Sequence, residues 1–558
     1  MLSERGKIGF VSFVVILLCA VIVVRLVYLQ MYKHDYYEDI VKRQSFKEIK
    51  IKTERGKIYD TNGVLLAKEN NVASVFVYGL DKKEVNYIKK RLKKFGVRKK
   101  IRDGNFHWLA RNIGIDTARK ISAISSNINY VITKHRFYPF GTSFSQIIGF
   151  TGVDNQGLSG VEGIYEKYLK GNDISFTFLK DSRNRLIMNS DYRDDIQNNR
   201  YIKLTVDSKL QRMSEAVLIE DLEKFRAKRG IVLVIDVKSG EIVVSVSKPD
   251  FDPNEFKRFD KETWKNYATQ YTFEPGSIFK PVTFSYLLNN YKLNLNKTID
   301  CENGRYRVYG HVYNDVHRYD KIKISEVLIH SSNVGTIKLM EKVSDSKFYN
   351  YLRKLGFGKK VNVVGALEER GILRDYKSWS KLSKYSISIG QEIYVTPIQM
   401  IRFYAAVANG GYYIKPTFIK EIYYGDGFLK VKSDIVRVFD ERVAKKLQHL
   451  LRMVVIEGTG QNANSDYVAI AGKTGTAQKF DKLKGSYSTK DYVASFAGFF
   501  PYDKPKYAMI VIYDSPRKSI YGGSTAALTF KRIAEQIMLL NGEKIRIYRV
   551  SDESKRAA

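Results

Sequence analysis

Ser277 and Lys280 have the residue types and the spacing that acyl transfer through a serine requires. A serine hydroxyl is a weak nucleophile until a neighbouring base takes its proton, and a lysine is such a base only when it is neutral near pH 7. Pro281 has no amide donor and belongs in the first turn of a helix, which predicts a helix start near Ser277. Ser277 and Lys280 then share one helix face, where the helix dipole lowers the lysine pKa. Alone, the pair is a weak signal and also fits a helix start with a solvated lysine.

A second motif, Ser331-Ser332-Asn333, is predicted on a loop or a short helical turn. The Ser331 hydroxyl could pass a proton between Lys280 and a leaving amine, and the Asn333 amide could bind the backbone of a peptide substrate. In isolation, the motif is more typical of a helix N-cap than of a catalytic site.

A third motif, Lys473-Thr474-Gly475-Thr476, lies within small, β-compatible residues that predict a strand lining a cleft. Gly475 would let a substrate backbone approach closely and add to the edge of the sheet. Lys473 and the two threonine hydroxyls offer a cation and donors for a terminal carboxylate. A lone K-T-G triplet usually marks a turn, but three motifs in this order make coincidence improbable.

The three motifs together resemble those of the class B penicillin-binding proteins, and the division type more closely than the elongation type. Thr61 stands where the family usually has an arginine, and Ala526-Ala527-Leu528 stands where relatives have a proline before the last helix. Further matching segments run along nearly the whole chain: Arg55-Gly56-Lys57-Ile58-Tyr59-Asp60, Gly149-Phe150-Thr151-Gly152, Gly160-Val161-Glu162-Gly163, Phe273-Glu274-Pro275-Gly276, Ile389-Gly390-Gln391 and Tyr521-Gly522-Gly523.

The resemblance implies a role for each motif residue. Ser277 is the acyl-ester nucleophile, Lys280 its base, and Lys473 a catalytic and carboxylate-binding residue together with Thr474, Gly475 and Thr476. Ser331 and Asn333 relay protons and contact the substrate, and the backbone amides of Ser277 and Thr476 form the oxyanion hole. The implied substrate is the peptidoglycan stem peptide ending in D-Ala-D-Ala, carried on a lipid-linked precursor. β-Lactams are the implied inhibitors, and no cofactor is expected.

Three other functions are open alternatives: an elongation-type transpeptidase, a hydrolase such as a D,D-carboxypeptidase or β-lactamase, and a non-catalytic scaffold of the division complex. Hydrolysis needs a second base to activate water. Glu368 and Glu369 lie between the second and third motifs, but they lack the E-x-x-x-N arrangement of class A β-lactamases. The intact motifs argue against a scaffold without activity.

An apolar run from residue 8 to about residue 29 is long enough to span a bilayer. A cleaved signal peptide is the alternative, but no small-x-small site follows the run, so we expect a retained anchor. Arg5 and Lys7 favour a cytoplasmic N-terminus, whereas basic residues on the other side make the charge count equivocal. The resemblance implies a single-pass protein of the inner (cytoplasmic) membrane with an extracytoplasmic, periplasmic catalytic domain.

The formal net charge of +35 would suggest nucleic acid as a partner for a cytosolic protein, which the expected topology excludes. We expect the dense basic stretch at residues 89–100 to be a solvated helix face, or else a surface attracted to anionic lipid or wall polymers. Cys19 and Cys301 cannot plausibly pair, and the seven histidines show no zinc-ligand spacing, so no metal site is expected.

The chain has room for two or three domains. We expect a cytoplasmic segment (1–7), the anchor (8–29), a non-catalytic pedestal of the dimerisation type (30–200), the transpeptidase domain (201–542) and a charged tail (543–558). The expected fold is α/β (α+β), with an antiparallel sheet covered by helices on both faces. The expected elements are a helix at 210–225, strands at 231–235, 241–247, 493–500 and 507–513, and a last helix from about 525 to 540. The pedestal is too small for a glycosyltransferase, so the family partner is a multi-spanning membrane glycan polymerase.

Overall fold

The structure is a computed structural model that describes residues 4–52, 54–77, 82–95, 107–171, 173–180, 186–187, 200–291, 293–425, 427–481 and 484–542. Two compact units divide the chain: the first comprises Met1–Glu54 and Gly171–Asn198, and the second comprises Arg55–Lys170 and Asn199–Ala558. The expected charged tail, and the part of the basic stretch at residues 98–100, lie outside the described residues.

The first unit carries the apolar N-terminal helix. Its elements are α1 (Glu4–Val27), the π-helical turn η1 (Tyr28–Tyr32), α2 (His34–Ser45) and a small sheet of β1 (Phe46–Lys52), β6 (Asp173–Lys180) and β7 (Leu186–Ile187). Among the described residues, Ile8–Tyr32 is the one helical stretch long and apolar enough to cross a membrane, with a mean hydropathy of 3.0 and no buried side chains. The predicted anchor at residues 8–29 lies within it.

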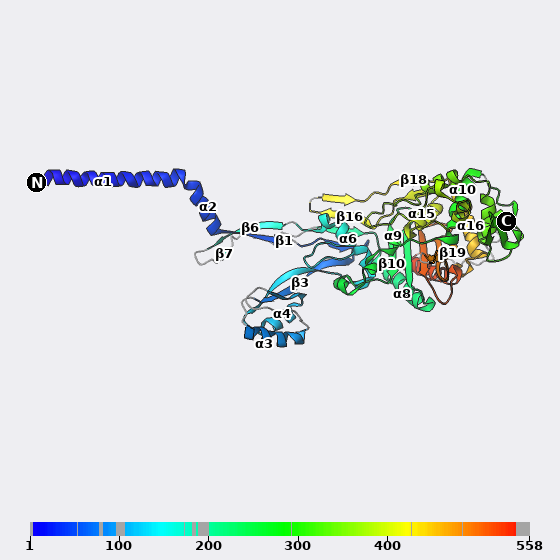
Figure 1. The fold of residues 1–558 in the computed structure, drawn as a ribbon, viewed down its shortest axis with the longest axis horizontal. Helices are drawn as coiled ribbons and strands as arrows, with labels where there is room; N and C mark the ends of the chain where they lie inside the picture. The colour runs from blue at the N-terminus through cyan, green and yellow to red at the C-terminus, as the bar shows by residue number, and fades with distance from the viewer. Residues whose placement is uncertain are drawn as a thin grey trace. The chain divides into compact units, whose positions relative to one another are not determined.

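The second unit is built around a five-stranded antiparallel sheet in the order β10-β9-β21-β20-β19. Figure 1 labels its two edge strands, β10 and β19. Its strands are β9 (Arg229–Asp236), β10 (Ile242–Lys248), β19 (Ala471–Asp481), β20 (Ser486–Phe500) and β21 (Tyr507–Asp514). The strands predicted at 231–235, 241–247, 493–500 and 507–513 are confirmed as β9, β10, β20 and β21. Strand β19, which carries the third motif, lies at an open edge of the sheet.

Helices cover both faces of this sheet, as predicted. Ile231 and Leu233 of β9 belong to one core, whereas Val232 and Val234 belong to the other, because side chains alternate along a strand. Helices α15 (Pro397–Ala408) and α16 (Glu441–Ile456) pack on the first face, and α8 (Ser208–Phe225) and α17 (Ala526–Leu540) pack on the second. The expected fold class is therefore confirmed.

A second, mixed sheet joins segments from distant parts of the chain. Its order is β17-β16-β8-β2-β3-β4, with β5 also paired to β3. Strand β8 (Tyr201–Leu204), expected to open the catalytic domain, runs parallel to β2 and antiparallel to β16. The remaining strands are β2 (Lys57–Tyr59), β3 (Leu65–Val77), β4 (His107–Ile113), β5 (Ile128–Phe137), β16 (Ile419–Tyr424) and β17 (Gly427–Lys430).

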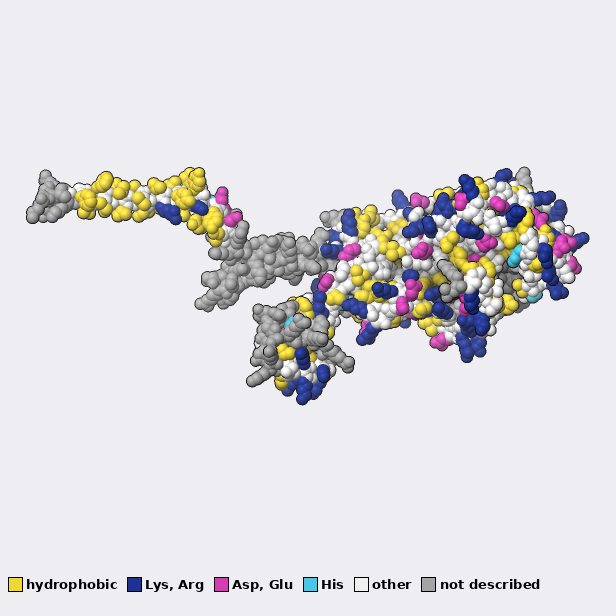
Figure 2. Space-filling view, viewed as in Figure 1, with side chains coloured by type: hydrophobic (Ala, Val, Ile, Leu, Met, Phe, Trp, Pro, Cys, Tyr) yellow, Lys and Arg dark blue, Asp and Glu magenta, His cyan; other side chains and the backbone are white. Residues whose placement is uncertain are grey.

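The described part of the basic stretch lies on α3 (Lys82–Leu92) and the 3-10 turn after it. Ile88 and Leu92 are buried against β3 and α4 (Ile115–Ser122), while Lys90, Arg91, Lys93 and Lys94 are exposed. The prediction of a solvated helix face is confirmed for these residues. Figure 2 shows other Lys and Arg side chains scattered over the visible face of the second unit, with acidic side chains between them.

Two of the motif segments in the N-terminal half meet in a buried ionic cluster. Arg55 Nε lies 2.6 Å from one carboxylate oxygen of Glu162, and Arg136 Nε lies 2.6 Å from the other. Asp60 accepts a hydrogen bond from the Ser208 amide at the start of α8, at 3.0 Å. Thr61 accepts one from Lys420 Nζ at 2.9 Å, so the residue that departs from the family pattern still has a cationic neighbour.

Candidate active site

Ser277 lies on the 3-10 turn η6 (Gly276–Phe279), directly before α10 (Lys280–Tyr291). Pro281 is the second residue of α10, as predicted. The Gly276 amide donates to the Gly390 carbonyl at 3.0 Å, and a Cβ on Gly390 would lie 2.1 Å from the Gly276 oxygen. Two glycine backbones in direct contact therefore hold the turn that presents Ser277.

Lys280 is fully buried beneath this turn. Its Nζ donates to the Ser331 carbonyl at 2.5 Å, to Asn333 Oδ1 at 2.7 Å and to Ser331 Oγ at 3.2 Å. Burial lowers the pKa of Lys280 to about 7, although the nearby Asp315 carboxylate raises it. A lysine with this pKa exchanges a proton near neutral pH, which is what a general base for a serine needs.

Ser331 lies between α11 (Ile324–Ile329) and α12 (Asn333–Met340), on the predicted loop. Its φ of +63° is uncommon for a residue with a side chain, and such conformations concentrate at functional sites. The N-terminus of α12 is capped by Ser332, whose hydroxyl accepts a hydrogen bond from the Gly335 amide at 2.9 Å. The N-cap interpretation thus applies to Ser332, whereas Ser331 and Asn333 face Lys280.

Lys473 is fully buried on β19, behind the cavity wall. Its Nζ donates to the carbonyl and hydroxyl of Thr474, at 3.2 and 3.3 Å, and to Thr459 Oγ1 at 3.4 Å. Burial and the charge of Lys280 hold its pKa well below the usual value. Thr474 and Thr476 line the cavity, whereas Lys473 is not among the lining residues and lies behind them, with its Nζ on the Thr474 and Thr459 hydroxyls.

Gly475 allows β19 to pass close to the nucleophile turn. A Cβ at this position would lie 2.5 Å from Ser495 Oγ and 2.9 Å from Ile278 Cγ2. The crowding comes from the chain itself, which differs from the expectation that Gly475 makes room for a substrate. Gly522 is equally confined, and its amide donates to Thr476 Oγ1 at 3.2 Å.

A cavity of about 780 Å³ brings the three motifs together. Ser277, Ser331, Asn333, Thr474 and Thr476 all line it, including both residues expected to supply the oxyanion hole. Lys280 and Lys473 lie directly behind this wall. Further lining residues that the sequence analysis did not single out for the site include Val316, His317, His330, Thr459, Asn462, Gln478, Tyr492, Ile520 and Ser524.

Asp315 and Thr459 are site residues that the sequence analysis missed. Asp315 binds the second motif, and Thr459 Oγ1 lies 2.7 Å from Thr474 Oγ1. Both reach the site through long-range packing, and neither belongs to a pattern of catalytic spacing. The flanking glycines of Gly458-Thr459-Gly460 are a local signal that could have drawn attention to Thr459.

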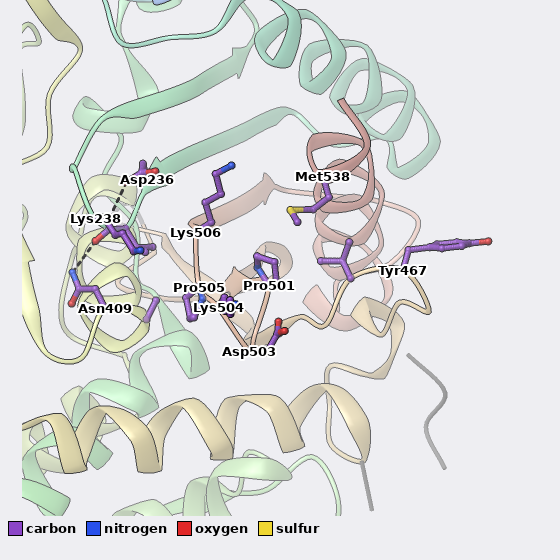
Figure 3. Close-up of a pocket in the computed structure, with 13 residues that line it drawn as sticks. Asp236, Lys238, Asn409, Tyr467, Pro501, Asp503, Lys504, Pro505, Lys506 and Met538 are labelled. Carbon is purple, nitrogen blue, oxygen red and sulfur yellow. Dashed lines mark hydrogen bonds between the residues drawn. The ribbon is translucent and has the colours of Figure 1, made fainter. Parts of the chain in front are cut away.

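A second cavity of about 790 Å³ lies at another place in the second unit, where β9 ends and β20 turns into β21 (Figure 3). Asp236 and Lys238 line one side, and Asp503 and Lys504 line another; Asn409 donates to the Val237 carbonyl at 2.9 Å. Its described lining has no serine, threonine, cysteine or histidine. The acyl-transfer chemistry therefore belongs to the first cavity.

The turn that carries Ser277 packs against the open edge of an antiparallel sheet, and helices cover both faces of that sheet. This is the arrangement of the serine acyltransferases that recognise penicillin. The family described as "Penicillin binding protein transpeptidase domain" matches residues 230–535, and "Penicillin-binding Protein dimerisation domain" matches residues 50–204. The chain belongs to the class B penicillin-binding proteins of the division type, which are serine-type D,D-transpeptidases. The family resemblance seen in the sequence is confirmed.

Several relatives are similar over nearly their whole length. Stage V sporulation protein D of Bacillus subtilis is 31% identical over 553 residues, covering 94% of this chain and 84% of the relative. Peptidoglycan D,D-transpeptidase FtsI of Escherichia coli is 29% identical, covering 95% and 92%. Probable peptidoglycan D,D-transpeptidase PenA of Neisseria gonorrhoeae is also 29% identical, with the same coverage.

Solved structures share the fold. A peptidoglycan synthetase from Bifidobacterium adolescentis superimposes with a TM-score of 0.71 at 22% identity, covering 90% of this chain and 98% of that one. Penicillin-binding protein 3 from Mycobacterium tuberculosis, complexed with aztreonam, gives a TM-score of 0.70 at 24% identity, covering 89% and 98%. At these identities the likeness concerns the fold alone.

Proposed function

We propose that the protein cross-links peptidoglycan stem peptides during septal wall synthesis, through an acyl-enzyme on Ser277. The observation that carries this proposal is the position of Lys280: a buried lysine with a pKa of about 7 lies behind a cavity that also holds Ser277 and Ser331. Ser277 Oγ attacks the carbonyl carbon of the penultimate D-alanine, and Lys280 Nζ takes the hydroxyl proton.

The backbone amides of Ser277 and Thr476 stabilise the oxyanion that forms. When the intermediate collapses, the peptide bond breaks and the proton passes from Lys280 through Ser331 to the amine of the departing D-alanine. An amine of a second stem peptide then attacks the ester carbonyl. Its proton passes to Lys280, the new peptide bond forms, and Ser277 recovers its hydroxyl.

The hydroxyls of Thr474 and Thr476 bind the terminal carboxylate of the donor peptide. Lys473 supports this contact from behind, because its ammonium reaches Thr474 and Thr459 instead of the cavity itself. β-Lactams, which carry a carboxylate next to a reactive amide, occupy the same site.

Hydrolysis is disfavoured because the described lining of the cavity holds no carboxylate that could activate water. Glu368, the candidate from the sequence, instead accepts from the amides of Val361 and Val363 at 2.8 and 3.0 Å. Glu274 lies near the nucleophile and burial raises its pKa to about 7, but its carboxylate binds the Glu392 amide and the Tyr487 hydroxyl.

The division of labour along the chain is part of the proposal. Residues 8–29 anchor the protein in the inner membrane with residues 1–7 in the cytoplasm, residues 30–200 form the pedestal, and residues 201–542 act on the outer side. The anchor and pedestal bind a multi-spanning glycan polymerase and proteins of the division complex. The long apolar helix and the match to a dimerisation domain support this assignment.

An assay that compares transpeptidation with hydrolysis tests the proposed function. The full-length protein in detergent is incubated with a donor peptide ending in D-Ala-D-Ala and a D-amino acid as acceptor, and the products are separated by mass spectrometry. We expect the acceptor adduct to exceed the hydrolysed peptide, and Ser277→Ala to abolish both. Hydrolysed peptide alone would show a carboxypeptidase, and no product with a folded protein would contradict the proposal.

A further inference from the structure

The end of a short hairpin contacts the second motif. Strands β12 (Arg305–Val308) and β13 (His311–Asn314) pair, and Asp315 follows directly. Asp315 Oδ1 accepts from the amides of Asn333 and Val334 at 2.5 and 3.0 Å, and Oδ2 accepts from Ser332 Oγ at 2.7 Å. The carboxylate thus binds three donors of the segment that follows Ser331.

The residue before it binds the same motif. The Asn314 carbonyl accepts from Asn333 Nδ2 at 2.9 Å. With its nitrogen bound there, the amide of Asn333 must turn its oxygen towards Lys280 Nζ, at 2.7 Å. Two consecutive hairpin residues therefore fix both the backbone and the side chain of Asn333.

We propose that Asp315 is a positioning residue for acyl transfer, whose carboxylate holds the Ser331–Asn333 turn so that its oxygens face Lys280. This inference rests on the proposed function of the site. Ser331 is held at a φ of +63°, which costs free energy and persists only when surrounding contacts impose it. The three bonds to Asp315 begin at the very next residue, and charge-assisted bonds of this kind are among the stronger ones in proteins.

Asp315 also acts on Lys280 through its charge. It raises the pKa of Lys280 and so offsets part of the effect of burial. From β19, the ammonium of Lys473 also interacts with Lys280, and the repulsion lowers the pKa of Lys473. His317 and His330 line the same cavity. Asp315 is the only carboxylate among the described residues that acts on Lys280, so its removal leaves the lysine pKa lower still.

A purely structural role makes a different prediction. If Asp315 served only to bind the first turn of α12, its neutral replacement would slow acylation equally at every pH. If Asp315 also influences the charge of Lys280, its replacement must shift the pH at which the acylation rate rises. The direction is fixed, because Lys280 acts as a base when neutral and a lower pKa makes it neutral at lower pH.

The test measures the second-order rate of acylation by a fluorescent penicillin between pH 5 and pH 9, about two units on each side of pH 7, where the wild-type rate is expected to rise (the acidic limb of the profile). It uses the full-length wild type, Asp315→Asn and Asp320→Asn. Asp320 is an exposed carboxylate five residues on, and it is not among the residues that line the cavity. For Asp315→Asn we expect acylation to be about 10- to 100-fold slower. Its acidic limb should also lie roughly one pH unit lower.

Ser332→Ala provides a second variant in case Asp315→Asn does not fold. It removes one bond to Asp315 but keeps the charge, so we expect slower acylation with an unmoved limb. The inference would be overturned if the acidic limb of the pH profile of Asp315→Asn lay at the wild-type pH. It would also be overturned if the acidic limb of Ser332→Ala shifted. If the wild type itself were not acylated at any pH, the proposed function would fail instead, and the same measurement distinguishes this outcome.

Discussion

Lys280 Nζ donates a 2.7 Å hydrogen bond to Oδ1 of Asn333, a residue 53 positions later in the chain. A buried ammonium needs acceptors in the folded state, and here all of its described hydrogen bonds run to the second motif. These bonds hold Lys280 in place through groups of the protein itself. The resting site is therefore organised around the lysine, and Ser277 completes it from the neighbouring turn.

The first prediction concerns this lysine. We expect acylation by penicillin to rise as the pH passes about 7, because Lys280 loses its proton there and becomes a base. Lys280→Arg should be roughly 10²- to 10⁴-fold slower at every pH, since a guanidinium does not deprotonate. Stopped-flow measurement of acylation gives both rates. Lys384→Arg is the control, because Lys384 is also buried but its Nζ donates to the Val343 carbonyl instead of to the second motif. Near-normal acylation of Lys280→Arg would point to another base.

The second prediction concerns the carboxylate site. Penicillin esterified at its carboxylate should acylate far more slowly than the free acid, because Thr474 and Thr476 lose their anionic partner. In Thr476→Val the ratio of the two rates should fall towards one. Thr476 also accepts the Gly522 amide, so we expect a stability loss of about 1 kcal/mol. Equal rates for acid and ester in the wild type would refute this site.

The third prediction separates stability from chemistry. Glu162 binds both Arg55 and Arg136 in the core of the second unit. Glu162→Gln should lower the free energy of unfolding by about 3–5 kcal/mol, because buried Arg136 loses its carboxylate partner and buried Arg55 keeps only Glu166. The exposed pair Arg111–Asp154 is the control, and Asp154→Asn should cost about 1 kcal/mol or less. Urea titration measures both, and similar losses for the two variants would show that the buried cluster has no special importance.

The fourth prediction concerns the anchor. A protein that begins at Lys33 should be soluble and still bind penicillin, because the site lies in the second unit. Exported without its span, it should not support septation in a depleted cell, since the proposed partner contacts at the span would be lost. Growth and penicillin labelling measured on the same cells test this. Full complementation would show that the anchor is only a tether.

The sequence predicted the strands of the central sheet, the covering helices α8 and α17 and the three motifs, because these depend on local periodicity and on chemically distinctive spacing. It did not predict α15 and α16 as elements. It did not reveal that the Lys473 side chain is fully buried, with its Nζ bonded to Thr474 and Thr459. The contact with Thr459 joins two segments through tertiary packing, which no local pattern encodes. Asp315 was missed for a related reason, since its contact with Ser332 joins a hairpin to a helix start through tertiary packing.

The mixed sheet could not be predicted from the sequence either. Strand β8 pairs with β2 in parallel, and no local pattern encodes a partner more than a hundred residues away. The Arg55 and Glu162 segments were recognised separately, but their ion pair appears only in the fold.

The central claim is that Ser277 carries the acyl group, and covalent labelling tests it most directly. The full-length protein is treated with penicillin and digested, and the modified peptide is identified by mass spectrometry. We expect the adduct on Ser277 itself, and no adduct in Ser277→Ala with an unchanged melting temperature. An adduct that persists in Ser277→Ala, or that maps to another residue, would contradict the account.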